Sequence, residues 1–136
     1  MLQAMNTGHD GSITTVHANS PRDAISRLET MCMMGTVSLP EKAIRTQIAS
    51  AVHIILQASR LGDGSRRITH ISEITGTSGD VVSMQYLFVF EKHGLGPGGK
   101  IKGRFRGTGV VPKFVEKLKA AGIPFNLDSL DVTVEV

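Results

Sequence analysis

A run of alternating apolar residues between positions 82 and 90 constrains the fold more than any other part of the sequence. Large apolar side chains stand at every second position of this run, namely Val82, Met84, Tyr86, Phe88 and Phe90. This spacing puts them on one face of a β-strand. Leu87 and Val89 lie on the opposite face, which predicts a strand that is covered on both sides. The chain must therefore build a sheet that supplies neighbours for this strand.

Two hairpins are predicted around this strand. An apolar run at residues 52–56 precedes a Gly-Asp-Gly-Ser turn at residues 62–65, and residues 66–74 return as the second arm. The apolar residues of that arm do not alternate strictly, which predicts a β-bulge or an irregular end. The glycine-rich residues 94–99 predict a second turn, followed by a strand at residues 100–106.

Three helices are predicted from capping signals and apolar spacing. Ser20 can cap the first helix, whose first turn holds Pro21 and Asp23. The second helix begins near Pro40, and the third spans residues 112–121 before Gly122. Together with the predicted strands, these helices indicate an α/β fold.

The N-terminal part of the chain carries further expectations. The β-branched run at residues 12–16 predicts a short buried strand, and the apolar residues between positions 1 and 6 predict the last turns of a helix. The single cysteine, Cys32, stands among three methionines near the end of the first helix, which predicts core packing. A lone cysteine excludes an intrachain disulfide and a zinc site built from several cysteines.

The size and composition of the chain limit its class. It has 136 residues, of which 40% are hydrophobic and 20% charged, as expected for one globular domain with an appendage. No apolar run approaches the roughly 18 residues that a membrane span needs, and residues 1–6 lack the pattern of a secretory signal. We therefore expect a cytosolic protein. The net charge of +3 is compatible with phosphate or anionic-lipid partners but requires neither.

The glycine-rich segment at residues 94–100 imitates the start of a phosphate-binding P-loop. Its glycines and Lys100 match that motif, but Ile101 stands where a serine or threonine would hold magnesium. Pro97 removes one backbone N–H, and the residues after Lys100 alternate like a strand instead of opening a helix. We therefore interpret this segment as a hairpin loop.

Four basic residues in the last predicted strand share one face. They are Lys100, Lys102, Arg104 and Arg106, whereas Ile101 and Phe105 point to the other face. Such a stripe could bind a nucleic-acid backbone. It could equally protect an exposed edge strand from pairing, and no aromatic side chain interleaves with it to stack on bases. A solvated edge is the preferred interpretation.

His9 and His17 form the densest polar group of the sequence, one on each side of the run at residues 12–16. Ligands in α/β folds bind at strand ends, where a histidine can donate a hydrogen bond to a phosphate. The alternative is that both histidines are structural. Their spacing does not favour a metal site, since none of His53, His70 and His93 is an evident third ligand. A Ser-His-Asp hydrolase lacks its Gly-x-Ser-x-Gly motif.

Several segments, taken together, resemble the secretion ATPases of type II and type IV systems. Residues 1–12 and 15–21 are similar to the histidine box of that superfamily, and more closely to its CpaF-like branch, which powers Flp (tight-adherence) pilus assembly. The similarity continues in order through residues 39–52, 63–68 and 108–114 and covers nearly the whole chain.

This resemblance implies a hexameric RecA-like motor that binds ATP and magnesium and works with inner-membrane platform proteins. The P-loop, the acidic boxes and the catalytic glutamate precede the matched residues in that family, so we expect this chain alone to be inactive. Residues 1–76 would be the later half of the RecA-like core, and residues 77–136 a strand pair with a helical extension. His9 and His17 would sense the γ-phosphate. A sheet without its earlier strands exposes an edge that dimerisation could cover.

Two other functions remain open. One is a nucleic-acid-binding domain that uses the basic stripe. The other is a non-catalytic partner that docks on complete ATPase subunits. We expect a cytoplasmic protein that reaches the inner membrane through its partners.

Overall fold

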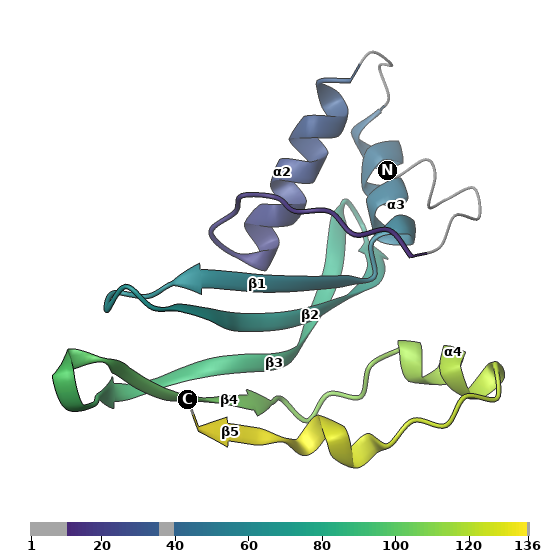
Figure 1. The fold of residues 1–136 in the computed structure, drawn as a ribbon. Helices are drawn as coiled ribbons and strands as arrows, with labels where there is room; N and C mark the ends of the chain where they lie inside the picture. Colours follow the sequence, from purple (N-terminus) through teal and green to yellow (C-terminus); the bar gives the residue numbers. More distant parts are fainter. Residues whose placement is uncertain (1–10, 36–39, 136) are drawn as a thin grey trace. The chain divides into compact units, whose positions relative to one another are not determined.

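The computed structural model describes residues 11–35 and 40–135, and its fold is α/β, as predicted (Figure 1). The described chain divides into two compact units. The first comprises the described parts of Met1–Ile55 together with Ile74–Met84, and the second comprises Leu56–Glu73 and Gln85–Val136. None of the helices in the described part of the chain is long and apolar enough to cross a membrane. The RecA-like relationship and the domain boundary after residue 76 remain predictions.

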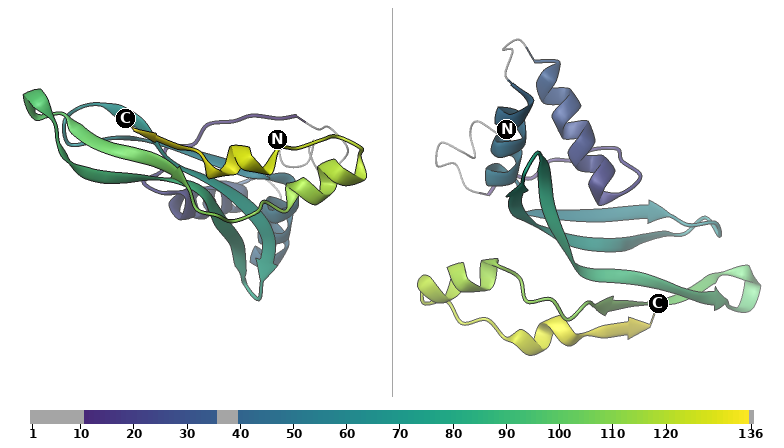
Figure 2. Two further views of the ribbon diagram at one scale, coloured as in Figure 1. Left: turned by 90° about the horizontal axis from the view of Figure 1, so that it is seen from below. Right: turned by 180° about the vertical axis from the view of Figure 1, so that it is seen from behind.

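Two helices of the first unit, α2 (Pro21–Met33) and α3 (Glu41–Ala51), form where capping and apolar spacing predict them. They lie side by side in Figure 1 and in the right-hand view of Figure 2. Leu28 of α2 packs with Ile44 and Ile48 of α3 in one buried cluster. Burial of these branched side chains contributes about 1.5–3 kcal/mol each, so the helix pair depends on packing more than on intrinsic propensity.

A second buried cluster joins α2 to the strands of the same unit. Ile25 packs there with Ile74 and Val82, and Arg22 at the start of α2 donates a hydrogen bond to the backbone carbonyl of Val82. These contacts hold the first turns of α2 against the strands, and so they also fix the start of the helix beside His17.

One expectation for the first unit is wrong, and another holds only in part. Residues 12–16 do not form a buried strand: they are irregular, and Ile13 is 96% exposed. A β-branched sequence becomes a strand only beside another strand, and none of the described residues pairs with it. The end of α2 is also less buried than predicted. Cys32 is half-buried beside the Leu28 cluster, but Met31, Met33 and Met34 are exposed. The predicted helix at residues 1–6 lies outside the described residues.

Among the described residues, five strands form one sheet in the order of the sequence, as in a meander. The strands are β1 (Ile54–Arg60), β2 (Arg66–Ser78), β3 (Val81–Leu95), β4 (Ile101–Gly107) and β5 (Thr133–Glu135). Both predicted hairpins are confirmed. The segment that imitates a P-loop lies at the end of β3 and in a 3₁₀ turn, Pro97–Gly99, so it is a hairpin loop.

The basic strand β4 is not an edge strand, contrary to expectation, because the short β5 pairs with it. Phe105 of β4 stands between Phe90 of β3 and Val134 of β5, in an antiparallel ladder. Arg104 stands opposite Glu91 and Glu135 on the other face. One face of this part of the sheet is therefore apolar and the other charged.

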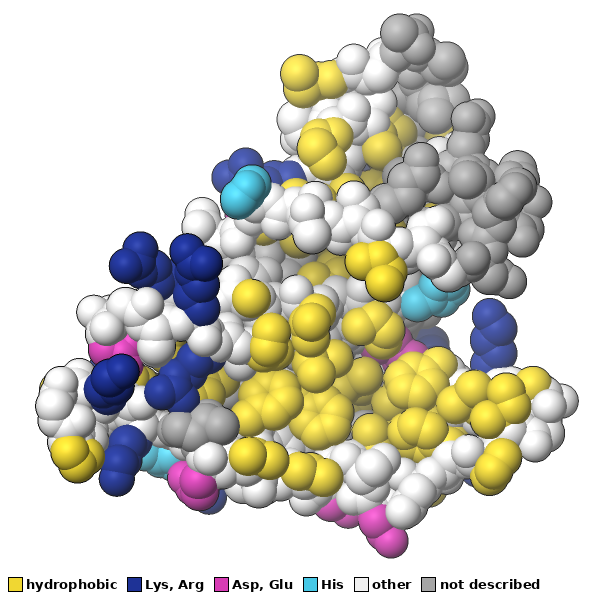
Figure 3. Space-filling view, in the orientation of Figure 1, with side chains coloured by type: hydrophobic (Ala, Val, Ile, Leu, Met, Phe, Trp, Pro, Cys, Tyr) yellow, Lys and Arg dark blue, Asp and Glu magenta, His cyan; other side chains and the backbone are white. Residues whose placement is uncertain are grey.

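The expected cover on both faces of residues 82–90 is only partly present. Val82 and Leu87 are buried, but Tyr86 is 40% exposed. In the second unit, the C-terminal residues add the helix α4 (Phe114–Ala120), with Val115 buried, and the 3₁₀ turn η2 (Leu127–Asp131). Figure 3 shows hydrophobic side chains gathered on the viewed face of the molecule.

Candidate functional site

His17 lies in a hollow beside α2, within the first unit. The hollow measures about 630 Å³ and is wide open to solvent. His17 is exposed, and the other residues around the hollow are Thr15, Val16, Asp23, Ser26, Arg27, Thr30 and Met31. The His17 imidazole and the Arg27 guanidinium can donate hydrogen bonds to an anion, whereas the hydroxyls of Ser26 and Thr30 donate to backbone carbonyls of α2.

The start of α2 holds this group in place. Ser20 Oγ accepts the backbone N–H of Asp23 at 3.0 Å, and the Asp23 carboxylate accepts the backbone N–H of Asn19 at 2.9 Å. These reciprocal bonds satisfy donors that a helix N-terminus leaves unpaired. The backbone is therefore fixed two residues after His17.

Asp23 also orients a basic side chain. Its Oδ2 accepts a hydrogen bond from Arg27 Nε at 3.2 Å, one helical turn away. The backbone N–H of Asn19 and then the Arg27 guanidinium stabilise the carboxylate, so the pKa of Asp23 lies below its usual range. Sequence reasoning did not single out Arg27, although the i, i+4 spacing from Asp23 is a recognisable signal.

The other predicted histidines are placed as follows. His9 lies outside the described residues. His70 of β2 packs against Tyr86 of β3, with ring centroids 5.0 Å apart, and burial lowers its pKa. His93 Nε2 lies 4.0 Å from a Glu91 oxygen. Across residues 11–35 and 40–135, no three His, Cys, Asp or Glu side chains meet in a way that could hold a metal ion.

The basic stripe of β4 is divided into two pairs. Arg104 Nε lies 3.2 Å from one oxygen of Glu91, and Arg106 bonds to the other oxygen. The guanidinium of Arg106, followed by that of Arg104, lowers the pKa of Glu91. Lys100 and Lys102 are exposed toward the β3–β4 loop. Two of the four cations are therefore engaged by one carboxylate, which weakens the stripe as a continuous surface for a phosphate backbone.

Two carboxylates of the second unit that accept hydrogen bonds from distant segments were also not predicted from the sequence. Glu73 of β2 is 4% exposed and accepts the backbone N–H groups of Lys113 and Phe114. Asp63, in the β1–β2 turn, accepts the backbone N–H of Ile101. Both residues accept hydrogen bonds from segments that are distant in the sequence. Local sequence patterns therefore do not predict these hydrogen bonds.

Comparison with known proteins gives a family match. Residues 1–84 match the profile of the family described as type II/IV secretion system protein. The match includes His17, the hollow beside α2 and both helices of the first unit.

Individual relatives have related descriptions. A putative conjugal transfer protein of Mycobacterium tuberculosis (strain CDC 1551 / Oshkosh) is 37% identical over 81 residues, which are 60% of this chain and 22% of the relative. The conjugal transfer protein TrbB of Rhizobium radiobacter is 36% identical over 76 residues, which are 56% of this chain and 22% of that protein. The type IV secretion system protein PtlH of Bordetella pertussis is 39% identical over 69 residues, which are 48% of this chain and 20% of that protein. The matched part is about a fifth of each relative.

Proposed function

The chain belongs to the type II/IV secretion system protein family, and we propose that it is the nucleotide-responsive section of a secretion ATPase that follows the phosphate-binding part. In the assembled enzyme, ATP hydrolysis would drive secretion or, as in the CpaF-like branch, pilus assembly. The motor would be a hexamer that works with inner-membrane platform proteins. These finer assignments rest on the resemblance of the matched segments.

The observation that supports this role best is that His17 and Arg27 line the same open hollow. A γ-phosphate carries negative charge on several oxygens, and stabilising that charge is the main task of a phosphoryl-transfer site. His17 and Arg27 line one open space, and the capped start of α2 fixes the backbone between them. We propose that His17 donates a hydrogen bond to the γ-phosphate and that Arg27 is its neighbour there. His9 would belong to the same group.

The chain alone is not expected to turn over ATP. Its sequence contains no complete P-loop, and the segment at residues 94–100 that imitates one is a hairpin loop. Without a cradle of backbone N–H groups and a magnesium ligand, one histidine cannot bind ATP tightly. ATP and magnesium would be held mainly by the phosphate-binding part of the enzyme.

A chimera tests this proposal. Residues 1–84 would replace the matched segment in the Rhizobium TrbB relative, and magnesium-dependent ATP hydrolysis would be measured alongside the 136-residue chain. We expect turnover by the chimera and none by the chain. His17→Ala in the chimera should lower kcat about 100-fold with a smaller change in KM, because the lost hydrogen bond acts mainly on the transition state.

Lys42→Ala is the matched control, since Lys42 is exposed on α3 and does not line the hollow. Circular dichroism and the oligomeric state would show that each variant is folded. ATP turnover by the isolated chain would contradict the proposal that ATP and magnesium are held by the phosphate-binding part of the enzyme. A folded, active chimera whose rate is indifferent to His17→Ala would contradict the role of the histidine.

A further inference from the structure

Hydrogen bonds join the ends of the two hairpins in the second unit. The backbone N–H of Ile101, at the start of β4, donates to Asp63 Oδ2 in the β1–β2 turn at 2.7 Å. The backbone carbonyl of the same residue accepts a hydrogen bond from Arg67 Nη2 of β2 at 2.9 Å. Both polar groups of one peptide residue are thus bound by the other hairpin. We call the joined residues 60–67 and 92–102 the hairpin end.

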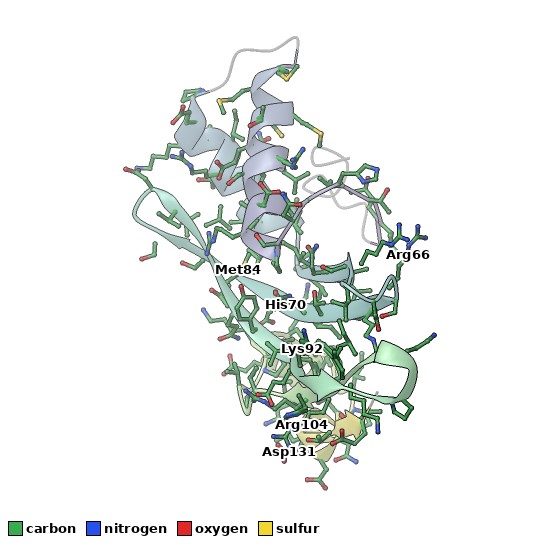
Figure 4. The ribbon with its side chains drawn as sticks, turned by 90° about the vertical axis from the view of Figure 1, so that its left-hand side faces the viewer. Arg66, His70, Met84, Lys92, Arg104 and Asp131 are labelled. Carbon is green, nitrogen blue, oxygen red and sulfur yellow. The ribbon has the colours of Figure 1, made fainter. Side chains whose placement is uncertain are left out.

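The hairpin end is strongly basic. Its basic side chains are Arg60, Arg66, Arg67, Lys92, Lys100 and Lys102, and all except the half-buried Arg67 are exposed. Figure 4 looks onto this side of the molecule, with Arg66 and Lys92 labelled on the two hairpins. In Figure 3 the Lys and Arg side chains gather at the same, left-hand side.

Little negative charge offsets these cations. Asp63 is the acidic residue of the hairpin end, and its two oxygens already accept hydrogen bonds from Ser65 and Ile101. The neighbouring Glu91 is occupied by Arg104 and Arg106. The acidic residues Asp128 and Asp131 lie instead in η2. The hairpin end therefore presents a net positive surface to solvent.

The hairpin end also carries an exposed apolar side chain. Leu95, at the end of β3, is 69% exposed, and Pro97 follows it in the loop between Lys92 and Lys100. Exposed leucine has no role in a purely electrostatic contact, because burying its apolar surface requires a partner that excludes water. Lysines with long apolar stems next to such a residue can keep their ammonium groups at a polar boundary.

From these observations we propose that the hairpin end binds directly to a bilayer that contains anionic lipids. The lysines and arginines contact the headgroups, and Leu95 enters the boundary between headgroups and acyl chains. A nucleic acid fits less well. Single strands stack on aromatic side chains, and the sequence of residues 60–67 and 92–102 contains no Phe, Tyr or Trp. The inference is independent of ATP binding and of the role of His17.

The attraction should be additive over the cations and sensitive to salt. Each lysine or arginine near an anionic surface strengthens binding about fivefold at moderate ionic strength. The attraction falls within a Debye length, which is about 10 Å at 0.1 M salt. Binding by several cations and one leucine is therefore expected to be reversible and much weaker at high salt.

Vesicle flotation with the 136-residue chain tests the proposal. Phosphatidylcholine vesicles would be compared with vesicles that contain about one-third phosphatidylglycerol, at low and high sodium chloride. We expect binding to the anionic vesicles alone, with strong loss at high salt. Arg66→Gln combined with Lys100→Gln should weaken binding about 25-fold, as two removed cations require. Leu95→Ser should weaken it about tenfold while the salt dependence persists.

Lys117→Gln combined with Lys119→Gln is the matched control. It removes the same charge from exposed positions of α4, outside the hairpin end, and should leave vesicle binding within about twofold. Thermal unfolding would show that all variants are folded. The proposal is overturned if neutral vesicles bind equally well, or if the α4 pair weakens binding as much as the hairpin pair. It is also overturned if Leu95→Ser leaves vesicle binding unchanged. A further contradicting result would be displacement of the chain from the vesicles by duplex DNA at a matched phosphate concentration.

Discussion

Glu73 and Phe114 are 41 residues apart in sequence and directly bonded, since Glu73 Oε2 accepts the backbone N–H of Phe114 at 2.9 Å. The other carboxylate oxygen accepts the backbone N–H of Lys113 and the side-chain amide of Gln85, each at 2.8 Å. A buried strand residue therefore holds the first turn of α4. All of these residues belong to the second unit.

Replacing this carboxylate should loosen α4. Glu73→Ala leaves two backbone N–H groups and one amide without their acceptor, and the expected loss in the free energy of unfolding is about 3 kcal/mol. Urea denaturation would measure it, and amide hydrogen exchange should quicken in residues 113–120. Glu116→Gln, at an exposed position of α4, is the control and should change stability by less than about 0.5 kcal/mol. Unchanged exchange in α4 after Glu73→Ala would contradict this role.

Asp63 should make stability depend on pH in the acidic range. The hydroxyl of Ser65, followed by the backbone N–H of Ile101, lowers the pKa of Asp63 far below its usual range. A depressed carboxyl pKa contributes stability that is present above the unfolded value of about 3.9 and is lost as pH falls toward the folded value. Asp63→Asn should therefore be less stable than wild type at neutral pH, and the difference should shrink below about pH 4.

Urea unfolding at neutral pH and at several acidic values would measure this effect. Asp80→Asn, at an exposed turn position, is the control and should leave the curve of stability against pH nearly unchanged. A constant difference between wild type and Asp63→Asn at every pH would show that the charge of the carboxylate is unimportant.

Gly103 is required by the close approach of β4 to β3. A Cβ at this position would collide with the backbone carbonyl of Glu91 and with the Phe90 ring. Gly103→Ala should lower the free energy of unfolding by about 2 kcal/mol, as expected for overpacking against a backbone atom. Gly62→Ala is the control because its Cβ would meet no atom within 4 Å and its φ is not positive. Similar thermal unfolding of the two variants would contradict the proposed steric limit.

The sequence predicts local structure well for physical reasons that particular residues illustrate. Ser20 and Asp23 bond within four residues of each other, so their capping pattern alone places the start of α2. The β1–β2 turn forms from adjacent glycine, aspartate and serine residues, and both strands beside it carry β-branched residues. In each case the partners of the interaction lie in one short stretch of chain.

Features that depend on distant partners could not be predicted in the same way. The run at residues 12–16 has the composition of a strand but lacks a paired strand among the described residues. The alternation of β4 predicted a basic face, yet it did not show that β5 covers one edge. At the candidate site, the resemblance led to His17, whereas the place of Arg27 beside the same hollow required the structure of α2.

Glu91 limits how strongly β4 can attract polyanions, and this yields a last prediction. Its two oxygens bond to Arg104 and Arg106, so Glu91→Gln should release two guanidinium groups on the same face. The variant should bind duplex DNA or heparin more tightly than wild type at low salt. If both arginines then contact phosphates, the slope of log K against log salt should steepen by about 2. Fluorescence anisotropy at several salt concentrations would measure it, with Glu135→Gln as a charge-matched control in β5. An equal gain in both variants would indicate net charge alone, whereas a gain confined to Glu91→Gln would show that this carboxylate keeps the basic stripe from acting as a nucleic-acid surface.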